Sequence, residues 1–329
     1  MTGPVSGPDP AARSRPANDA GPLPDSALGV GWRREICGII AALEGIGFCE
    51  VIAESLAVAA PRKRRRAGVG RLIGNSGRRA VDSPPNRDVL VPEELSALIE
   101  RGIRVVPHGI SLSLGGAEPV ADERVAHLAE CARALDAPLV SEHIAFVRAG
   151  GLEAGHLLPV PRTRQALDAL ARNISRTQRD LEVPLAVENI AALFEWPDAE
   201  FTDAEFLQEL VERTGVYLLI DIANVYANAR NRSRDPLTEL RRLPAERIAY
   251  CHVAGGQEAG GRYHDTHVHP VPPEVLALVR EFTADHAVPL MLERDGNYPL
   301  ATELLAELNA IAGESNRPSI TLRAGVLSP

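Results

Sequence analysis

From Leu28 onwards, short apolar runs alternate with longer segments in which apolar residues recur at helical spacing. The short runs have the length of buried strands, and many follow a Pro or Gly, which suits a turn from helix to strand. We therefore predict eight strands, at Leu28–Trp32, Gly47–Ala53, Arg104–Gly109, Pro138–Phe146, Pro184–Ile190, Val216–Ile222, Arg247–Val253 and Pro289–Leu292.

The longer segments have the periodicity of amphipathic helices. They lie at Pro92–Arg101, Val120–Leu135, Thr163–Asp180, Asp203–Thr214, Asp235–Leu240, Pro273–His286 and Ala301–Ala312. Alternating strands and helices between residues 27 and 313 predict an α/β protein of the (β/α)8, or TIM-barrel, class. An open doubly wound sheet is the alternative, but no G-x-G-x-x-G motif follows the first strand, which weakens it.

Three segments depart from this alternation. Residues 1–26 are rich in Pro, Gly, Ala, Ser and Asp, so we expect a disordered tail there, and residues 314–329 are expected to form a C-terminal tail. Pro61–Asp88 interrupts the barrel pattern between the second and third strands, where we expect a βα loop at the catalytic face. A solvated loop and a clamp for an acidic peptide, partner protein or phosphate both remain open for it. Its nine basic residues are Arg62, Lys63, Arg64, Arg65, Arg66, Arg71, Arg78, Arg79 and Arg87.

Composition narrows the class of protein. The chain of 329 residues is 45% hydrophobic, which is typical of a globular protein, and no apolar run has the length of a membrane span. Its formal net charge of −9 argues against a general nucleic-acid binder. The four cysteines show no C-x-x-C spacing and most lie in apolar stretches, so we expect reduced thiols in the cytoplasm.

Residues that commonly bind metals close six consecutive predicted strands, the third to the eighth. These candidate ligands are His108, His143, Glu188, Asp221, His252 and Glu293, joined by Asp265 and His267 in the segment after the seventh strand. Strand ends of a barrel meet at one face, so we expect these side chains to converge. Asp265 and His267 are two residues apart, which in extended backbone places both side chains on the same side.

Four imidazoles and four carboxylates exceed what one metal ion requires, so we predict two or three ions with bridging carboxylates. A nitrogen and oxygen ligand set without thiolate favours iron, manganese or zinc. Some members could instead be hydrogen-bonded partners that orient the ligands.

Polar residues beside these candidates form a second set. We propose Asn224, Arg294 and Asp295 as catalytic candidates. Asn224 could orient a ligand, contact substrate or stabilise bound oxygen, and Arg294 could hold a peptide carboxylate or offset the negative charge of the site. Asp295 could act as a base or form a salt bridge. Glu142 is expected to point away from the neighbouring His143.

The motifs that carry these residues resemble one known family, the multinuclear non-haem iron-dependent oxidative enzymes, which include the methanobactin-synthesising oxidase. The matching motifs are Val106-Pro-His108-Gly-Ile-Ser-Leu-Ser-Leu114-Gly, Val140-Ser-Glu-His143, Leu157-Leu-Pro-Val-Pro161, Val187-Glu-Asn189, Leu218-Leu-Ile-Asp221-Ile-Ala-Asn224-Val-Tyr226, His252-Val-Ala-Gly255, Asp265-Thr-His267 and Leu292-Glu-Arg-Asp295. The resemblance spans Gly29 to Pro299. It departs from the family at Gly31–Glu35, where a Pro-His-Tyr is missing, and at Glu54-Ser55 in place of Glu-Asn.

The resemblance implies a TIM barrel related to xylose isomerase, with all eight candidate ligands binding iron and with Glu188 and Asp221 as bridging carboxylates. It further implies two or three iron ions (Fe²⁺/Fe³⁺), O2 as co-substrate, and oxidative modification of a residue, most often Cys, in a ribosomally made peptide. A small partner protein usually delivers that peptide. Two alternatives stay open: a divalent-metal sugar isomerase or phosphodiesterase, and a non-catalytic metal-dependent scaffold that binds a partner through its basic loop.

Overall fold

The computed structural model describes residues 21–59 and 88–323, and within them eight parallel strands form a closed barrel. The barrel strands are β1 (Leu28–Trp32), β3 (Phe48–Ile52), β4 (Arg104–Gly109), β5 (Val140–His143), β8 (Leu185–Glu188), β9 (Tyr217–Asp221), β10 (Ile248–Val253) and β13 (Leu290–Leu292). They follow one another in the order of the chain, and β1 closes the ring by pairing with both β3 and β13. The (β/α)8 prediction is therefore confirmed.

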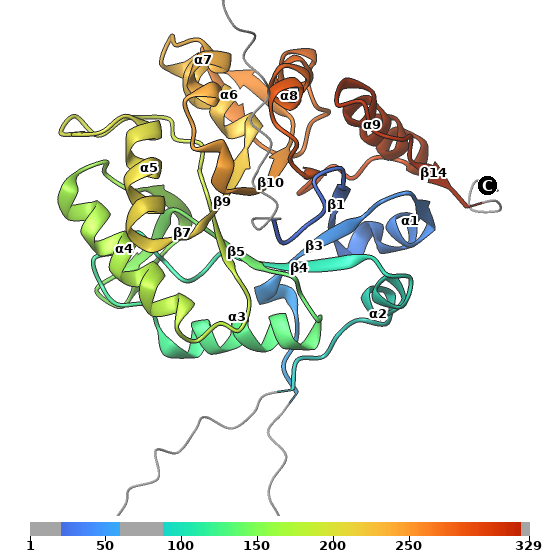
Figure 1. Ribbon diagram of the computed structural model, residues 1–329, viewed down its shortest axis with the longest axis horizontal. Coiled ribbons are helices and arrows are strands. Elements are labelled where there is room, and N and C mark those ends of the chain that lie inside the picture. Colours follow the sequence, from blue (N-terminus) through green and yellow to red (C-terminus); the bar gives the residue numbers. More distant parts are fainter. Residues whose placement is uncertain (1–20, 60–87, 324–329) are drawn as a thin grey trace, which may run out of the picture.

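Helices surround the strands, as Figure 1 shows. They are α1 (Cys37–Ala42), α2 (Glu93–Glu100), α3 (Asp122–Ala134), α4 (Arg164–Gln178), α5 (Asp203–Thr214), α6 (Ile222–Asn231), α7 (Pro236–Arg241), α8 (Pro273–Asp285) and α9 (Ala301–Glu314). Each of the seven predicted helices is present. Among the helices in the described part of the chain, none has the length and hydrophobicity that a membrane crossing requires.

Three local predictions differ from the structure. The predicted strand Pro138–Phe146 divides into β5 and β6 (Ala145–Ala149), because β6 leaves the barrel and pairs antiparallel with β7 (Leu152–Pro159). Helix α6 begins directly after β9, where the sequence predicted the strand to continue. The segment after β10 forms a hairpin of β11 (Gly256–Ala259) and β12 (Arg262–Asp265), where the sequence predicted a loop.

Short segments at both ends of the barrel domain pack against it. Leu23, which falls within the predicted N-terminal tail, is buried with the residues of the barrel interior, and β14 (Thr321–Leu322) pairs with β2 (Leu43–Glu44). The remaining tail residues, 1–20 and 324–329, lie outside the described residues. The predicted basic loop Pro61–Asp88 also lies outside the described residues, apart from Asp88. The backbone carbonyl of Asp88 accepts a hydrogen bond from the N–H of Ala59.

Side chains inside the barrel form two layers. The lower layer is an apolar cluster that receives one residue from most strands, and two residues further along each strand the interior becomes polar. This step of two follows from the alternation of side chains along a strand. The apolar and polar pairs are Phe48 and Glu50, Val106 and His108, Leu139 and Ser141, Ala186 and Glu188, Leu219 and Asp221, Tyr250 and His252, and Met291 and Glu293.

Strand β1 contributes glycines to the interior instead of side chains. A Cβ atom at Gly29 would lie 2.7 Å from the ring of Phe48, and one at Gly31 would lie 3.2 Å from the guanidinium of Arg33. The missing side chains make room for an aromatic ring in the apolar layer and for a cation above it.

Candidate metal centre

The polar layer of the barrel holds the predicted ligands, at the carboxyl ends of the strands. Six of them lie on strands or directly after them, and each of those except His143 is at most 5% exposed. Charged groups at this depth require partners of opposite charge or metal ions. Together the eight candidates form three groups of potential ligand atoms, which share members.

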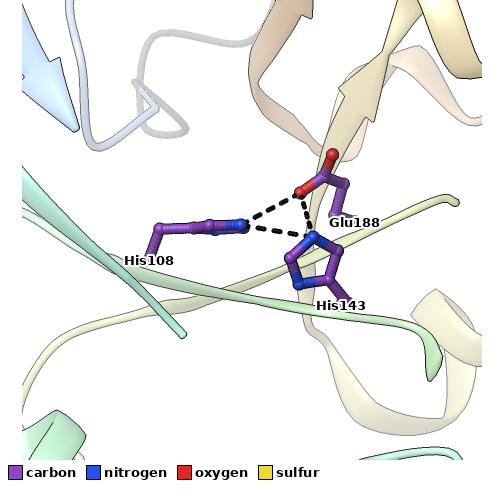
Figure 2. A group of neighbouring side chains, drawn as sticks. All are labelled: His108, His143 and Glu188. Carbon is purple, nitrogen blue, oxygen red and sulfur yellow. Dashed lines mark hydrogen bonds and ion pairs between the residues drawn. The ribbon is translucent and has the colours of Figure 1, made fainter. Parts of the chain in front are cut away.

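The first group consists of His108, His143 and Glu188 (Figure 2). The Nε2 atoms of the two histidines lie 3.3 Å apart, and each lies 3.3–3.4 Å from Oε2 of Glu188. Ligands about 2.1 Å from one metal ion, at tetrahedral or octahedral angles, are about 3.0–3.4 Å apart. The three atoms therefore have the spacing of ligands around a common ion.

Both imidazoles of this group are oriented by their other nitrogen. Nδ1 of His108 lies 2.8 Å from the hydroxyl of Ser141, and Nδ1 of His143 lies 3.1 Å from the carbonyl oxygen of Gly109. Since that carbonyl can only accept a hydrogen bond, Nδ1 of His143 carries the proton and donates, and Nε2 is the nitrogen left for a metal. The sequence could not predict which nitrogen faces the site.

The second group consists of Glu188, Asp221, His252 and Glu293. Nδ1 of His252 lies 3.3 Å from Oε1 of Glu188 and 2.9 Å from Oε2 of Glu293. His252 thus faces this group with Nδ1, in contrast to the Nε2 atoms of the first group.

The third group consists of Asp221, Asp265 and His267. Nε2 of His267 lies 2.6 Å from Oδ2 of Asp265 and 3.4 Å from Oδ2 of Asp221. Asp265 comes from the end of β12, and His267 has a left-handed backbone with φ of 53°. The two side chains therefore meet through a turn, and the extended backbone that the sequence suggested for them is wrong.

Two carboxylates connect the three groups. Glu188 presents Oε2 to the first group and Oε1 to the second, and Asp221 belongs to both the second and the third. A carboxylate whose two oxygens face different ligand sets, as those of Glu188 do, is suited to bridge two ions. Oδ1 of Asp221 instead accepts from the backbone N–H of Asn224, so Asp221 has only Oδ2 for the groups that share it.

The donor atoms at the centre of these groups fit metal ions. Among the described residues, several buried side-chain atoms have no hydrogen-bond partner although atoms of opposite character lie close by. His252 Nδ1 and Glu293 Oε2, for example, lie 2.9 Å apart without hydrogen-bond geometry, as expected for two atoms that point at a common third position. The other such atoms in the three groups are Glu188 Oε2, Asp221 Oδ2, Asp265 Oδ1 and His267 Nε2.

The metal-free site stabilises protons on its histidines. Burial lowers the pKa of His143, but the carboxylates of Glu188 and Glu142 outweigh it and raise that pKa to about 9. Burial likewise opposes the charged form of His252, yet Glu50 and Glu293 raise its pKa well above the ordinary value. Burial raises the pKa of Asp221 to about 7, although the charge of His267 opposes the change. The carboxylates therefore attract positive charge to the centre, as metal ligands do.

Asn189 and Asn224 hold the ends of β8 and β9 together. The side chain of Asn189 accepts from the backbone N–H of Asp221 at 2.9 Å, and Asn224 donates its amide to the carbonyl of Asn189 at 3.0 Å. Asp221 caps α6 by accepting from the backbone N–H of Asn224 through Oδ1, which leaves Oδ2 for the ligand groups. These contacts give Asn224 a ligand-orienting position.

Glu142 supports the turn after β4, outside the ligand groups. Its Oε2 accepts from the backbone N–H groups of Ser111 and Leu112, at 3.1 and 2.8 Å. Its Oε1 accepts from the backbone N–H of His143. The carboxylate consequently fixes the loop beside the first group. Its Oε1 also lies 3.4 Å from Nδ1 of His143, so the expectation that Glu142 points away from His143 is wrong.

Arg294 lies apart from the other candidates. Its guanidinium is 3.4 Å from Glu307 on α9, so its charge is directed away from the ligand groups. The cation that accompanies Glu293 is Arg33, which the sequence analysis did not identify. Arg33 lies 3.3 Å from Glu293 and 2.5 Å from Asp295.

Asp295 stands at the open side of the centre. Its side chain is 40% exposed, and its Oδ2 lies 3.5 Å from Nδ1 of His267 while Oδ1 binds Arg33. Asp295, His267 and Glu293 form a fourth group of potential ligand atoms. Because the guanidinium of Arg33 already contacts two of its carboxylates, we assign this group to an ion pair.

A further buried carboxylate, Glu50, was also missed by the sequence analysis. It is fully buried, and its Oε2 lies 3.0 Å from Nε2 of His252. Glu50 occupies the middle of a predicted strand, and we considered only strand ends as candidates. Counting two residues on from the apolar Phe48, as on the other strands, would have found it.

Comparison with known proteins identifies the family of the chain. Residues 87–315 match the family model described as RiPP precursor modification enzyme MbnB/TglH/ChrH. The chain is 49% identical over 291 residues to a UPF0276 protein of Streptomyces avermitilis, a match that covers 86% of this chain and 54% of that protein. The chain thus spans about half the length of that relative. A UPF0276 protein of Caulobacter vibrioides is 37% identical over 207 residues, which cover 62% of this chain and 74% of that protein.

Among solved structures, D-psicose 3-epimerase of Clostridium cellulolyticum, in complex with D-tagatose, has a TM-score of 0.51. The likeness covers 88% of this chain and 98% of the epimerase at 13% identity, so it concerns the barrel fold alone. The family match covers most of the barrel and all eight candidate ligands. The chain therefore belongs to the MbnB/TglH/ChrH family of RiPP precursor modification enzymes.

Proposed function

We propose that this protein is a multinuclear non-haem iron enzyme that uses O2 to modify a residue in a ribosomally made peptide, with Cys as the leading candidate for that residue. One observation carries the proposal: three groups of nitrogen and oxygen donors share Glu188 and Asp221 in a chain of a peptide-modifying family. Mixed imidazole and carboxylate ligands without thiolate suit iron, and the shared carboxylates suit neighbouring ions.

Each group of residues has a definable task in this reaction. Bound iron supplies redox capacity and coordination positions for a substrate sulfur and for O2. The imidazoles and carboxylates hold the ions at fixed spacing, and the apolar layer beneath them excludes water from one side. Arg33 offsets part of the negative charge where Glu293 meets Asp295. Asp295, half exposed beside His267, is placed to accept a proton from a bound substrate.

The surface around the centre suits a peptide. All large hydrophobic side chains that are exposed in the described residues lie in segments between a barrel strand and the helix that follows it. These segments surround the catalytic face of a TIM barrel. The residues are Leu90, Ile110, Leu152, Leu193, Phe194 and Leu300. Because all of these segments lie at the catalytic face, we propose this face for the peptide and for a small protein that delivers it.

Metal analysis and oxygen uptake test the proposal together. Protein purified without air should contain two or three iron ions per chain and should consume O2 in the presence of a Cys-containing precursor peptide. The variants Glu188→Ala and His252→Ala should lose iron and oxygen uptake, whereas Glu209→Ala, a carboxylate on the outer helix α5, should retain both.

Two results would count against the proposal. Full iron content in both ligand variants would show that the ligand assignment is wrong. Zinc or manganese as the bound metal, without oxygen uptake, would place the chain with divalent-metal isomerases instead.

A further inference from the structure

Directly beneath the ligand groups, three buried side chains connect two histidines of different groups. Glu50 Oε2 lies 3.0 Å from His252 Nε2 and accepts a hydrogen bond from the hydroxyl of Tyr250. The hydroxyls of Tyr250 and Ser141 lie 2.8 Å apart, and Ser141 lies 2.8 Å from His108 Nδ1. Glu50, Tyr250, Ser141 and His252 are fully buried and His108 nearly so, which removes water as a competing partner.

Chemistry fixes the direction of every hydrogen bond in this chain. An ionised carboxylate only accepts, so both Tyr250 and the Nε2–H of His252 donate to Glu50. The phenol has then used its single proton, and Ser141 must donate to the phenol oxygen. Ser141 is left to accept from Nδ1–H of His108. All donors therefore point, directly or in sequence, toward Glu50.

This direction decides which nitrogen of each histidine can bind a metal. With its proton on Nε2, His252 offers Nδ1 to Glu188 and Glu293. With its proton on Nδ1, His108 offers Nε2 to His143 and Glu188. One carboxylate thus accounts for the opposite orientation of the two rings, although they face different ligand groups.

We propose that Glu50 is a positioning residue that sets the metal-binding nitrogen of His252 directly and that of His108 through Tyr250 and Ser141. Glu50 thereby fixes the orientation of one histidine in the first ligand group and of one in the second. The inference rests on the metal centre of the proposed function and is independent of iron or oxygen chemistry. Orienting partners of this kind change metal affinity about 10–100-fold when they are removed.

The two ends of the chain can be separated by substitution. Glu50→Leu removes the acceptor for both branches, so both histidines should lose their fixed orientation. Tyr250→Phe breaks only the branch that leads to Ser141 and His108, and the bond between Glu50 and His252 remains. Glu54→Leu is the matched control, because Glu54 lies just beyond the same strand but is exposed and accepts from the backbone N–H of Ile110.

The test uses full-length protein loaded with Zn(II), which is diamagnetic and does not react with O2. Nitrogen NMR of ¹⁵N-histidine protein reports which ring nitrogen carries a proton, and competition with a chelator gives the Zn(II) affinity. Wild-type protein and E54L should show protonated Nε2 on His252 and protonated Nδ1 on His108. E50L should change both signals and weaken Zn(II) binding about 10–100-fold, whereas Y250F should change only that of His108.

Unchanged ring signals and unchanged affinity in E50L would overturn the proposal. So would a Y250F protein in which His252 changes as much as His108. Failure of the proposed oxidase function would leave these signals untouched, because Zn(II) supports no oxygen chemistry.

Discussion

Protons and metal ions compete for Nε2 of His143. The carboxylates of Glu188 and Glu142 outweigh the effect of burial and raise the pKa of His143 to about 9, from an ordinary value near 6.5. Because a metal ion binds the unprotonated nitrogen, each ion must displace a proton. Two pH units separate pH 7 from this pKa, so at pH 7 only about one chain in 100 offers the free nitrogen.

Metal affinity should therefore rise with pH by about tenfold per unit between pH 7 and 9, with release of at least one proton per ion. The pKa values of His252 and His267 also lie well above the ordinary one. Loss of their protons as the pH rises should therefore increase the metal affinity further. A histidine with its ordinary pKa would change the affinity less than about twofold over the same range. Binding of Mn(II), followed by loss of the free-ion EPR signal between pH 6.5 and 8.5, measures the slope.

The variant Glu142→Gln isolates the contribution of His143. It removes one of the charges that raise the pKa but keeps an oxygen that accepts from Ser111 and Leu112. Its binding curve should level off at lower pH than that of the wild type, with the ligand groups intact. A wild-type affinity that does not change between pH 7 and 8.5, or superimposable curves for the two proteins, would refute the electrostatic reasoning.

Three other perturbations have defined outcomes. Glu188→Ala should remove more than one metal ion per chain and Asp265→Ala only one, since Glu188 faces two ligand groups; elemental analysis of the two variants distinguishes them. Arg33→Leu leaves two carboxylates without their cation and should lower the free energy of unfolding of the metal-free protein by about 3 kcal/mol, which urea denaturation would detect. Gly29→Ala places a Cβ 2.7 Å from a buried aromatic ring and should lower the free energy of unfolding by about 1–3 kcal/mol. Gly38→Ala, with open space around its Cβ, should leave that free energy unchanged. Equal urea-denaturation midpoints for these two variants would contradict the packing argument.

The barrel could be predicted from sequence because its strands are buried on both faces. Such strands form continuous apolar runs that remain visible without any knowledge of their neighbours. Helix α6 was missed because it begins directly after β9, without a turn between them, and most of its residues are buried like those of a strand. The hairpins β6–β7 and β11–β12 were missed because their pairing is local and their exposed strands lack an apolar run.

Six of the eight candidate ligands could be predicted from the sequence because they end predicted strands. Their hydrogen-bond and ion-pair partners could not be predicted in this way. Glu50 lies in the middle of β3, where a carboxylate in an apolar run has no obvious assignment. Arg33 reaches Glu293 across 260 positions of sequence, past the space that Gly31 leaves free. Both belong to the polar layer only because the barrel closes, and closure is a property of the complete sheet. Arg294, by contrast, was selected for its position beside Glu293, and successive residues at a strand end point in opposite directions.

The charges of the polar layer explain why its ligands and their supports occur together. Five carboxylates, from Glu50, Glu188, Asp221, Asp265 and Glu293, lie close together in space at one end of the barrel. Arg33 offsets part of their charge. In the metal-free protein, the carboxylates raise the histidine pKa values despite burial. The histidines therefore hold protons, which supply further positive charge. Metal ions and protons therefore satisfy the same electrostatic demand at the same nitrogens. Of these carboxylates, Glu50 alone lies beneath the ligand groups. In the metal-free protein the charges of His252 and His108 outweigh burial and lower the pKa of Glu50 to about 2, which keeps it an acceptor.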